Sequence, residues 1–276
     1  MLWQTRTQTF DLARRGVVMG VLNVTPDSFS DGGRWLDVDA AVAHGAEMFS
    51  QGAQIVDVGG ESTRPGAEPV AESEELRRVL PVIERLAALG AVVSIDTMKA
   101  NVARAACAAG ASVINDVGGL RDETMLFAVK ETGAGVVIMH MKGEPLTMQT
   151  APRYENVTRE VQDSFCTAMK RCLRCGVPAE KIIFDPGIGF GKTVEHNIEL
   201  LRRLPELHVG ERPLLIGVSR KSFIGKVLGS DALEDRAWPT VALTSYCRER
   251  GARVFRVHDV KPNVEALRMT EAIVAG

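Results

Sequence analysis

The chain has 276 residues, of which 45% are hydrophobic and 25% are charged, and its net charge at pH 7 is −2. This balance gives no reason to expect nucleic acid or an anionic membrane as a partner, and we expect neither. No apolar stretch approaches the roughly 18 residues of a transmembrane helix, and the N-terminus lacks the apolar core of a signal peptide. We therefore expect a cytoplasmic protein whose five cysteines are reduced thiols.

Eight short apolar segments recur along the chain, and polar residues follow each of them. The segments are Val17–Leu22, Ile55–Val58, Val92–Ile95, Val113–Ile114, Val136–Met139, Ile182–Phe184, Leu214–Val218 and Val254–Val257. Continuous runs of Val, Ile and Leu are typical of parallel strands that are covered on both faces. Packing does not explain polar residues placed only at the carboxyl ends of strands, which is where a (β/α)8 barrel builds its active site.

Helical patterns alternate with these strands. The predicted helices are Asp39–Gln51, Glu72–Leu89, Lys99–Ala109, Glu123–Glu131, Val157–Cys175, Val194–Leu204, Leu233–Arg250 and Val264–Val274. We expect Asp39 to cap the first helix, and glycines 133 and 176 to end two others. The alternation predicts a single (β/α)8 TIM-barrel domain over residues 1–276. An open doubly wound sheet is the alternative, but it would gather its ligand groups at one switch point.

Three connections are longer than the others and are expected to be functional loops, namely Thr25–Val38, Glu61–Ala71 and Gly143–Asn156. A further segment, Gly187–Thr193, is similar to a phosphate-binding P-loop. That motif requires glycine where Pro186 stands, so we expect no nucleoside triphosphate here. Its three alternating glycines instead predict a backbone that approaches another group closely.

Asp96, Asn115 and Asp185 close the third, fourth and sixth predicted strands. Each alone is as readily explained as a turn or capping residue, but three that converge on one face indicate a site. A carboxylate accepts two parallel hydrogen bonds from adjacent N–H donors, so this set suits an amidine-like or 2-aminopyrimidinone edge. A metal site is the competing interpretation, weakened by the central Asn and by few nearby histidines.

Cationic residues gather at the last two strand ends. Lys221 follows the seventh strand beside Arg220, where a lysine either binds an anion or forms a Schiff base, as in aldolases. Arg256 and His258 alternate along the last strand and therefore point to one face, the barrel interior. Burying Arg and His without partners is costly, so an anionic ligand is the favoured explanation. A core histidine at position 258 is the alternative.

Several motifs resemble those of the dihydropteroate synthase family of pterin-binding barrels, and they occur in family order along almost the whole chain. The matching segments are Met19–Gly33, Asp57–Gly66, Ile95–Thr97, Ile114–Val117, Met139–Met141, Asp185–Gly187, Gly189–Lys192, Ser219–Ser222 and Arg256–Val260. The resemblance implies a homodimeric transferase of folate biosynthesis, the target of sulfonamides. Such an enzyme joins 6-hydroxymethyl-7,8-dihydropterin pyrophosphate to p-aminobenzoate and releases pyrophosphate.

The resemblance also implies roles for individual residues. The catalytic set is Asp96, Asp185, Lys221, Arg256 and His258. The pterin pocket comprises Asp96, Asn115, Met139, Asp185, Lys221 and Arg256, and the p-aminobenzoate pocket comprises Thr63, Pro65, Phe190, Lys221 and Ser222. The pyrophosphate contacts are Asn23, Thr63, Arg64, Arg256 and His258. Asn23 also helps to hold Mg2+, the implied cofactor.

Two residues depart from the family pattern: Ile188 stands where Phe is common, and Pro239 stands where glycine is usual. The chemistry expected is an SN1-like substitution, in which fixed charges stabilise a pterin cation and a departing anion. Two other functions stay open from the sequence. One is methyl transfer from methyl-tetrahydrofolate to a corrinoid, which has no use for the pair Arg256 and His258. The other is a non-catalytic pterin-binding protein.

Overall fold

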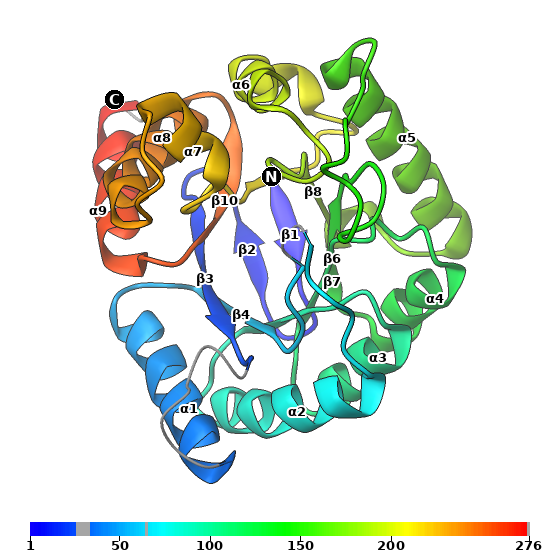
Figure 1. Cartoon of the computed structure of the whole chain (residues 1–276). Helices are drawn as coiled ribbons and strands as arrows, with labels where there is room; N and C mark the ends of the chain where they lie inside the picture. Colours follow the sequence, from blue (N-terminus) through cyan, green and yellow to red (C-terminus); the bar gives the residue numbers. More distant parts are fainter. Residues whose placement is uncertain (26–33, 64–65, 275–276) are drawn as a thin grey trace.

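The computed structural model is a closed barrel of eight parallel strands, which confirms the predicted (β/α)8 fold (Figure 1). The strands are β3 (Val17–Asn23), β4 (Ile55–Gly59), β5 (Val93–Asp96), β6 (Val113–Asp116), β7 (Gly135–Met139), β8 (Ile182–Asp185), β9 (Leu214–Ile216) and β10 (Ala252–Val257). They pair in chain order, and β10 closes the ring against β3. The structure describes residues 1–25, 34–63 and 66–274.

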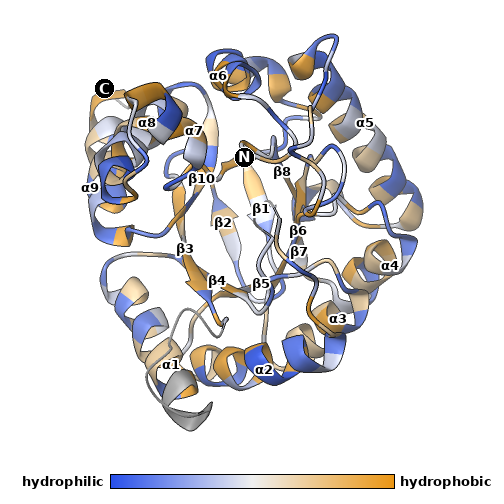
Figure 2. Cartoon of the chain, viewed as in Figure 1, coloured by the Kyte–Doolittle hydropathy of each residue, from blue (hydrophilic) through white to orange (hydrophobic). Residues whose placement is uncertain are grey.

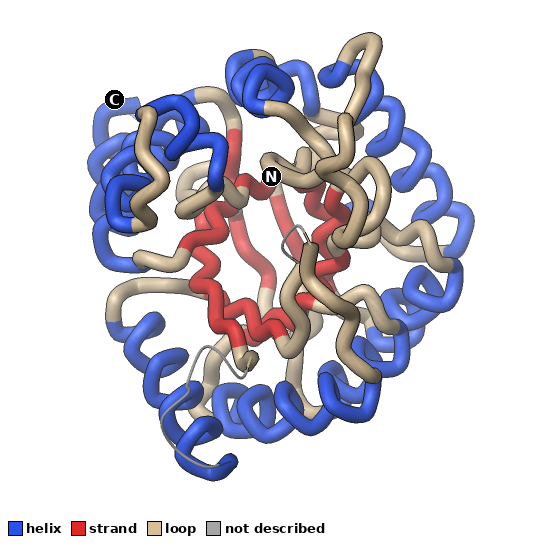
Figure 3. Tube along the Cα trace, in the orientation of Figure 1, coloured by secondary structure: helices blue, strands red, loops and turns tan. Residues whose placement is uncertain are grey.

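Helices surround the strands as an outer ring (Figure 3). They are α1 (Arg34–Ser50), α2 (Glu72–Ala88), α3 (Ala100–Ala108), α4 (Glu123–Thr132), α5 (Val157–Cys175), α6 (Val194–Arg202), α7 (Ser222–Leu228), α8 (Ala237–Glu249) and α9 (Val260–Val274). Hydrophilic and hydrophobic residues alternate along most of them, as expected of helices packed by one side against a sheet (Figure 2). Gly133 and Gly176, both in the left-handed conformation, end α4 and α5 as predicted.

Several predicted boundaries were wrong. Helix α1 begins at Arg34, so Asp39 lies inside the helix rather than capping it, and the first long loop is shorter than expected. The predicted helix Leu233–Arg250 is a 3-10 turn (Glu234–Arg236) followed by α8. Helix α7 was missed because its seven residues are too few for a clear periodic pattern. Pro239 lies in the first turn of α8, where a missing N–H is tolerated.

A hairpin that the sequence did not predict closes the amino-terminal end of the barrel. It consists of β1 (Leu2–Gln4) and β2 (Thr9–Asp11), which are antiparallel. Trp3 and Phe10 stack at 5.8 Å and pack with a layer of inward-facing strand residues. That layer comprises Val17, Met19, Ile55, Val92, Val113, Val137, Ile183, Leu215 and Val254. The hairpin seals this end, so a ligand has to enter from the carboxyl ends of the strands.

No helix in the described part of the chain is both long enough and apolar enough to cross a bilayer. The strands instead divide their side chains between two apolar layers. Val18 and Leu22 of β3 face the helices, whereas Val17 and Met19 face the barrel interior. This alternation explains why the strands appear as continuous apolar runs, and it fixes which residues point into the barrel above the sealed layer.

Candidate active site

The strand register brings the predicted polar residues into one row inside the barrel. Asn23 pairs with Gly59, Gly59 with Asp96, and Asp96 with Asn115. On the other side, Asp185 of β8 pairs with Met139 of β7. Since adjacent strands are about 4.8 Å apart, these side chains line one rim. The structure therefore brings together the polar residues that close the third, fourth and sixth predicted strands.

Arg256 lies at the centre of this rim, where it binds two carboxylates. Its Nε donates to Asp57 Oδ2 at 2.7 Å, and its Nη2 donates to Asp96 Oδ2 at 2.7 Å. Although burial opposes its charge, Asp57 and Asp96 raise the pKa of Arg256. The guanidinium is therefore a permanent cation, fixed in orientation by two donors that bind different carboxylates.

Asp57 is a site residue that sequence reasoning missed. Its side chain is fully buried, and its Oδ2 accepts from both Arg256 and Asn115 Nδ2, the latter at 3.0 Å. Because the amide nitrogen of Asn115 is directed at Asp57, its amide oxygen is turned elsewhere, which fixes the amide as an acceptor toward the rim. A signal existed in the sequence, since Asp57 is a charged residue inside an apolar strand.

Three buried carboxylate oxygens lack a hydrogen-bond partner among the described residues, and two of them, Asp57 Oδ1 and Asp96 Oδ1, belong to the carboxylates that bind Arg256. An unsatisfied buried acceptor costs about 1–3 kcal/mol, so Asp96 Oδ1, at the rim, is placed to receive a donor from a ligand. Burial raises the pKa of Asp96 above its usual range, an effect that Arg256 opposes and that Asp57 and Glu75 reinforce. Ionised Asp96 is thus held at a cost that a cationic or N–H-rich ligand would relieve.

Asp185 and Lys221 form the opposite side of the rim, and Gly217 lies between them. A Cβ atom built on Gly217 would stand 3.8 Å from Asp185 Oδ2 and 3.9 Å from both Lys221 Nζ and Arg256 Cβ. Glycine therefore places no side chain in the space that these three charged residues border. Burial lowers the pKa of Lys221 to about 8, against the pull of Asp185, and burial raises the pKa of Asp185.

The Lys221 ammonium donates to the Ile188 carbonyl and lies 4.5 Å from the centroid of the Phe190 ring. Lys221 also precedes α7, whose first residue, Ser222, is exposed. Arg220 differs from its neighbour: it binds Asp259 through two nitrogens, with Nε donating at 3.0 Å. That ion pair joins the loop after β9 to the loop after β10. Of the two neighbouring cations, Lys221 is therefore the one that faces the rim.

His258 lies beyond the last residue of β10, on the same face as Arg256. Ser219 Oγ accepts from the His258 backbone N–H at 3.1 Å and meets His258 Nδ1 at 3.0 Å. The hydroxyl thus holds the imidazole in one orientation, with Nε2 as the ring nitrogen that does not contact Ser219. The alternative of a core histidine is disfavoured, because the residue is partly exposed.

An apolar wall rises beside the polar rim. It consists of Val117, Met139, Met141 and Met148, with Met98 and Phe190 packed against it. Unbranched, polarizable methionine side chains adapt to the flat faces of rings. Phe190 is carried by the glycine-rich loop after β8, where a side chain at Gly187 (φ +65°) would collide with the His140 carbonyl. This confirms the predicted close approach of backbone. Ile188 is buried in the core.

Lys192 anchors the glycine-rich loop from beneath. Its Nζ donates to the carbonyls of Gly187 and Phe190 at 3.0 and 2.9 Å and lies 3.0 Å from His140 Nδ1. Burial lowers the pKa of Lys192 to about 7. The lysine that completes the P-loop-like motif is therefore a buried structural group rather than a phosphate ligand.

The remaining predicted residues lie on or beside the β4–α2 loop. Thr63 is half-buried and follows Gly59, a residue of the rim row, by four positions, whereas Arg64 and Pro65 lie outside the described residues. Asn23 ends β3, and its Oδ1 is 3.8 Å from the Cβ position of Gly59, beside Asp96 Oδ2 at 3.9 Å from the same point. The amide oxygen of Asn23 therefore faces the rim next to the carboxylates.

Comparison with known proteins relates this geometry to one family. The family described as pterin binding enzyme matches residues 19–258. Dihydropteroate synthase of Escherichia coli K12 is 48% identical over 94% of this chain and 92% of its own length. The enzyme of the same name from Synechocystis is 44% identical over 96% of this chain and 92% of its own.

Solved structures agree with the sequence comparison. Yersinia pestis dihydropteroate synthase, in a complex with a sulfonamide drug, superposes with a TM-score of 0.93 at 45% identity, covering all of both chains. The Xanthomonas albilineans enzyme with 4-aminobenzoic acid gives a TM-score of 0.91 at 45% identity, covering 97% of this chain and 96% of its own. The Burkholderia cenocepacia enzyme complexed with 7,8-dihydropteroate gives 0.90 at 41% identity, covering 99% and 96%.

Proposed function

The chain belongs to the family of pterin-binding enzymes, in which its relatives are dihydropteroate synthases, and from this premise we propose how its site acts. The reaction is a transfer in folate biosynthesis. It joins the 6-methylene group of 6-hydroxymethyl-7,8-dihydropterin pyrophosphate to the amine of p-aminobenzoate and releases pyrophosphate. Its relatives are dihydropteroate synthases, which disfavours methyl transfer to a corrinoid and pterin storage as functions of this chain.

The observation that carries the proposal is the unused oxygen Asp96 Oδ1, buried beside the cation of Arg256. A pterin presents adjacent N–H donors along its pyrimidine edge, and these would satisfy both Asp96 and Asp185. Asn115, with its amide nitrogen bonded to Asp57, would accept at the same edge. The space left by Gly217 and the wall with Met139 would hold the flat bicycle between them.

Charge separation is the main chemical problem in this reaction. As the C–O bond breaks, its electron pair leaves with the pyrophosphate and positive charge spreads into the pterin ring. Asp96 and Asp185 would stabilise the ring, while Arg256 and His258 would stabilise the departing anion. Fixed groups of this kind contribute about 3–4 kcal/mol each to catalysis. This division of charge favours an SN1-like substitution, in which bond breaking leads bond making.

The second substrate then attacks the methylene carbon. The arylamine is a weak base, so the site has to position it rather than remove a proton beforehand. We assign Phe190, Lys221, Ser222, Thr63 and Pro65 to its pocket, with the ammonium of Lys221 near the ring of Phe190 as the anchor. After the C–N bond forms, the nitrogen releases its extra proton to solvent. Sulfonamides, which mimic p-aminobenzoate, would compete for this pocket.

Mg2+ fits the donor set at the rim. Mg2+ prefers hard oxygen ligands and usually keeps several waters together with substrate phosphates. The amide oxygen of Asn23 faces the rim at the end of β3, so it would hold the ion with the pyrophosphate. Thr63 and Arg64 would be further contacts of the pyrophosphate, as the family resemblance implies. When bound, the ion would neutralise negative charge on the leaving group.

The proposed activity is tested by incubating the protein with the pterin pyrophosphate, p-aminobenzoate and Mg2+. We expect stoichiometric release of pyrophosphate with formation of dihydropteroate, and loss of turnover when EDTA removes the metal. Lysine-directed borohydride trapping during turnover should yield no adduct at Lys221. Turnover without metal, or a trapped Schiff base, would contradict the assignment.

A pH profile tests the charges on Asp96 and Lys221. Catalysis requires ionised Asp96. Because the pKa of Asp96 is raised, this carboxylate takes up a proton as the pH falls, before the usual pKa of about 4 is reached. Catalysis also requires protonated Lys221, which is lost as the pH rises through about 8. We therefore expect a bell-shaped dependence of kcat/KM, because this parameter reports the free enzyme. In Lys221→Arg, whose guanidinium does not titrate, the alkaline limb should move to higher pH; an unmoved limb would refute the assignment.

We also propose a homodimer in the cytoplasm, where the five free thiols would stay reduced. Consecutive elements α7, Glu234–Arg236 and α8 expose four large apolar side chains, those of Val227, Leu228, Leu233 and Trp238, the last at 76%. A patch of this kind marks an interaction surface, and a two-fold contact between copies would bury it. Trp238→Glu should convert a dimer to a monomer in sedimentation analysis. Wild-type protein that sediments as a monomer would exclude the dimer.

A further inference from the structure

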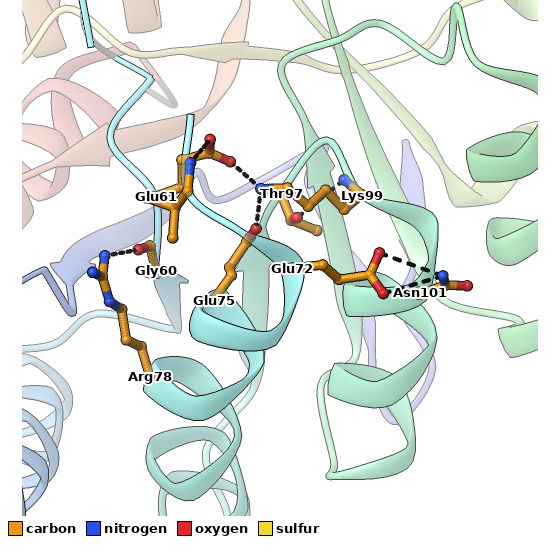
Figure 4. A network of polar contacts seen from close by, with 9 residues as sticks. Gly60, Glu61, Glu72, Glu75, Arg78, Thr97, Lys99 and Asn101 are labelled. Atoms are coloured by element: carbon orange, nitrogen blue, oxygen red, sulfur yellow. Dashed lines mark hydrogen bonds and ion pairs between the residues drawn. The ribbon is translucent and has the colours of Figure 1, made fainter. Parts of the chain in front are cut away.

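A polar network outside the rim fixes the base of the β4–α2 loop, which carries Thr63 (Figure 4). Glu61, two residues after the end of β4, accepts through Oε1 from the backbone N–H of Val70 at 2.8 Å. This bond joins two residues nine positions apart and closes the loop on itself. The Gly66 N–H donates to the Pro145 carbonyl at 3.2 Å, which attaches the loop to the segment before α5.

Lys99 connects this loop base to two other elements. Its Nζ donates to Glu61 Oε2 at 2.5 Å and to Glu75 Oε2 of α2 at 2.6 Å. Lys99 itself precedes α3 and lies three residues after Asp96, and its backbone N–H donates to Thr97 Oγ1 at 3.1 Å. One ammonium therefore ties together the ends of β4 and β5 and the first turn of α2.

The network depends on the positive charge of Lys99, because both of its ion-pair partners are buried carboxylates. Glu75 is fully buried, and the Glu61 side chain is only 7% exposed. Two carboxylates that share one ammonium repel each other in a low-dielectric setting, and Lys99 supplies the positive charge that offsets this repulsion. Burial lowers the pKa of Lys99, but its bonds to Glu61 and Glu75 outweigh that effect and raise it.

We propose that Lys99, with Glu61 and Glu75, is a positioning device that holds the Thr63 loop against the rim and thereby shapes the p-aminobenzoate pocket. This inference rests on the proposed function for the identity of the second substrate. No hydrogen bond of the network reaches a side chain assigned to the pterin, so we expect the pterin residues on the strands to keep their geometry without it. Loss of the lysine should therefore weaken binding of the second substrate and spare that of the first.

The test uses three variants of the whole protein. Lys99→Met removes the ammonium and retains an unbranched chain. Lys99→Arg restores a cation that can bind both carboxylates. Arg104→Met is the matched control, since Arg104 of α3 binds Glu131 at 2.7 Å on the outside of the barrel. A purely stabilising ion pair would lower the melting temperature without separating the two substrates.

For Lys99→Met we expect the KM for p-aminobenzoate to rise about tenfold, while the dissociation constant of the pterin pyrophosphate changes less than about twofold. Lys99→Arg should restore most of the loss, and Arg104→Met should match wild type. An unchanged KM for p-aminobenzoate, or equal losses for both substrates, would overturn the proposal.

Amide hydrogen exchange supplies a readout that does not need turnover. The Val70 amide, which is bonded to Glu61, should exchange faster in Lys99→Met than in wild type or Arg104→Met. Unchanged exchange would show that Lys99 does not hold the loop, whatever the reaction. If wild-type protein made no dihydropteroate while exchange responded as expected, the proposed function would fail but the loop anchor would stand.

Discussion

Replacing Arg256 by leucine is expected to lower kcat/KM for the pterin pyrophosphate by about a hundredfold to a thousandfold. The substitution removes the cation assigned to the departing pyrophosphate. It also leaves Asp57 and Asp96 as neighbouring buried carboxylates without their shared counter-ion. Burial already raises the pKa of Asp96, and without Arg256 to oppose that effect Asp96 will take up a proton more readily. The pterin would then lose an acceptor.

In the same experiment, Arg256→Lys distinguishes the effect of the positive charge from the effect of its fixed orientation. A lysine keeps the positive charge, but its single nitrogen cannot reproduce donation from Nε to Asp57 and from Nη2 to Asp96. We expect it to recover only part of the activity lost in Arg256→Leu. Steady-state kinetics with a circular dichroism check of folding measure both variants. Full recovery in Arg256→Lys would show that fixed orientation is unimportant.

Asp57→Asn should reduce kcat/KM by about a hundredfold, although Asp57 lies below the residues assigned to substrate contact. The amide keeps the shape of the side chain but removes the charge that holds Arg256, and it weakens the anchor of the Asn115 amide. Hydrogen bonds to charged groups contribute about 1.5–3 kcal/mol, so we also expect a loss of about 2 kcal/mol in the free energy of unfolding.

Glu271→Gln is the matched control for Asp57→Asn. Glu271 binds Arg248 at 2.7 Å, with side chains 12% and 7% exposed, and it accepts from the Gly16 N–H at the amino-terminal end of the barrel. This variant should lose comparable stability in chemical denaturation while its kinetics stay like wild type. If both variants lost activity in proportion to stability, Asp57 would be a structural residue only.

The fold and most of the rim could be predicted from the sequence, because parallel buried strands leave a simple pattern. Asp96, Asn115 and Asp185 each end a run of apolar residues, and strand register alone then brings them together. Asp57 was missed because it lies two residues before the end of its strand, whereas the prediction considered only polar residues at strand ends. Its position in the same inward-facing row as Ile55 and Gly59 was the available signal.

Other features depend on tertiary packing, which no local pattern encodes. The bridge from Lys99 to Glu61 and Glu75 joins three elements that are separated along the chain. The ion pair of Arg220 with Asp259 likewise spans 39 positions, so the sequence could not distinguish Arg220 from Lys221 as an anion ligand. The amino-terminal hairpin escaped prediction because strands of three residues are too short to show alternation.

The central claim is that one rim binds the pterin through carboxylates and the diphosphate through cations. Calorimetric titration tests it with the two halves of the substrate added separately, as 6-hydroxymethylpterin and as Mg2+ with pyrophosphate. Asp185→Asn should abolish pterin binding and retain diphosphate binding, and His258→Ala should do the reverse. Equal loss of both ligands in each variant, or loss of neither, would contradict the account.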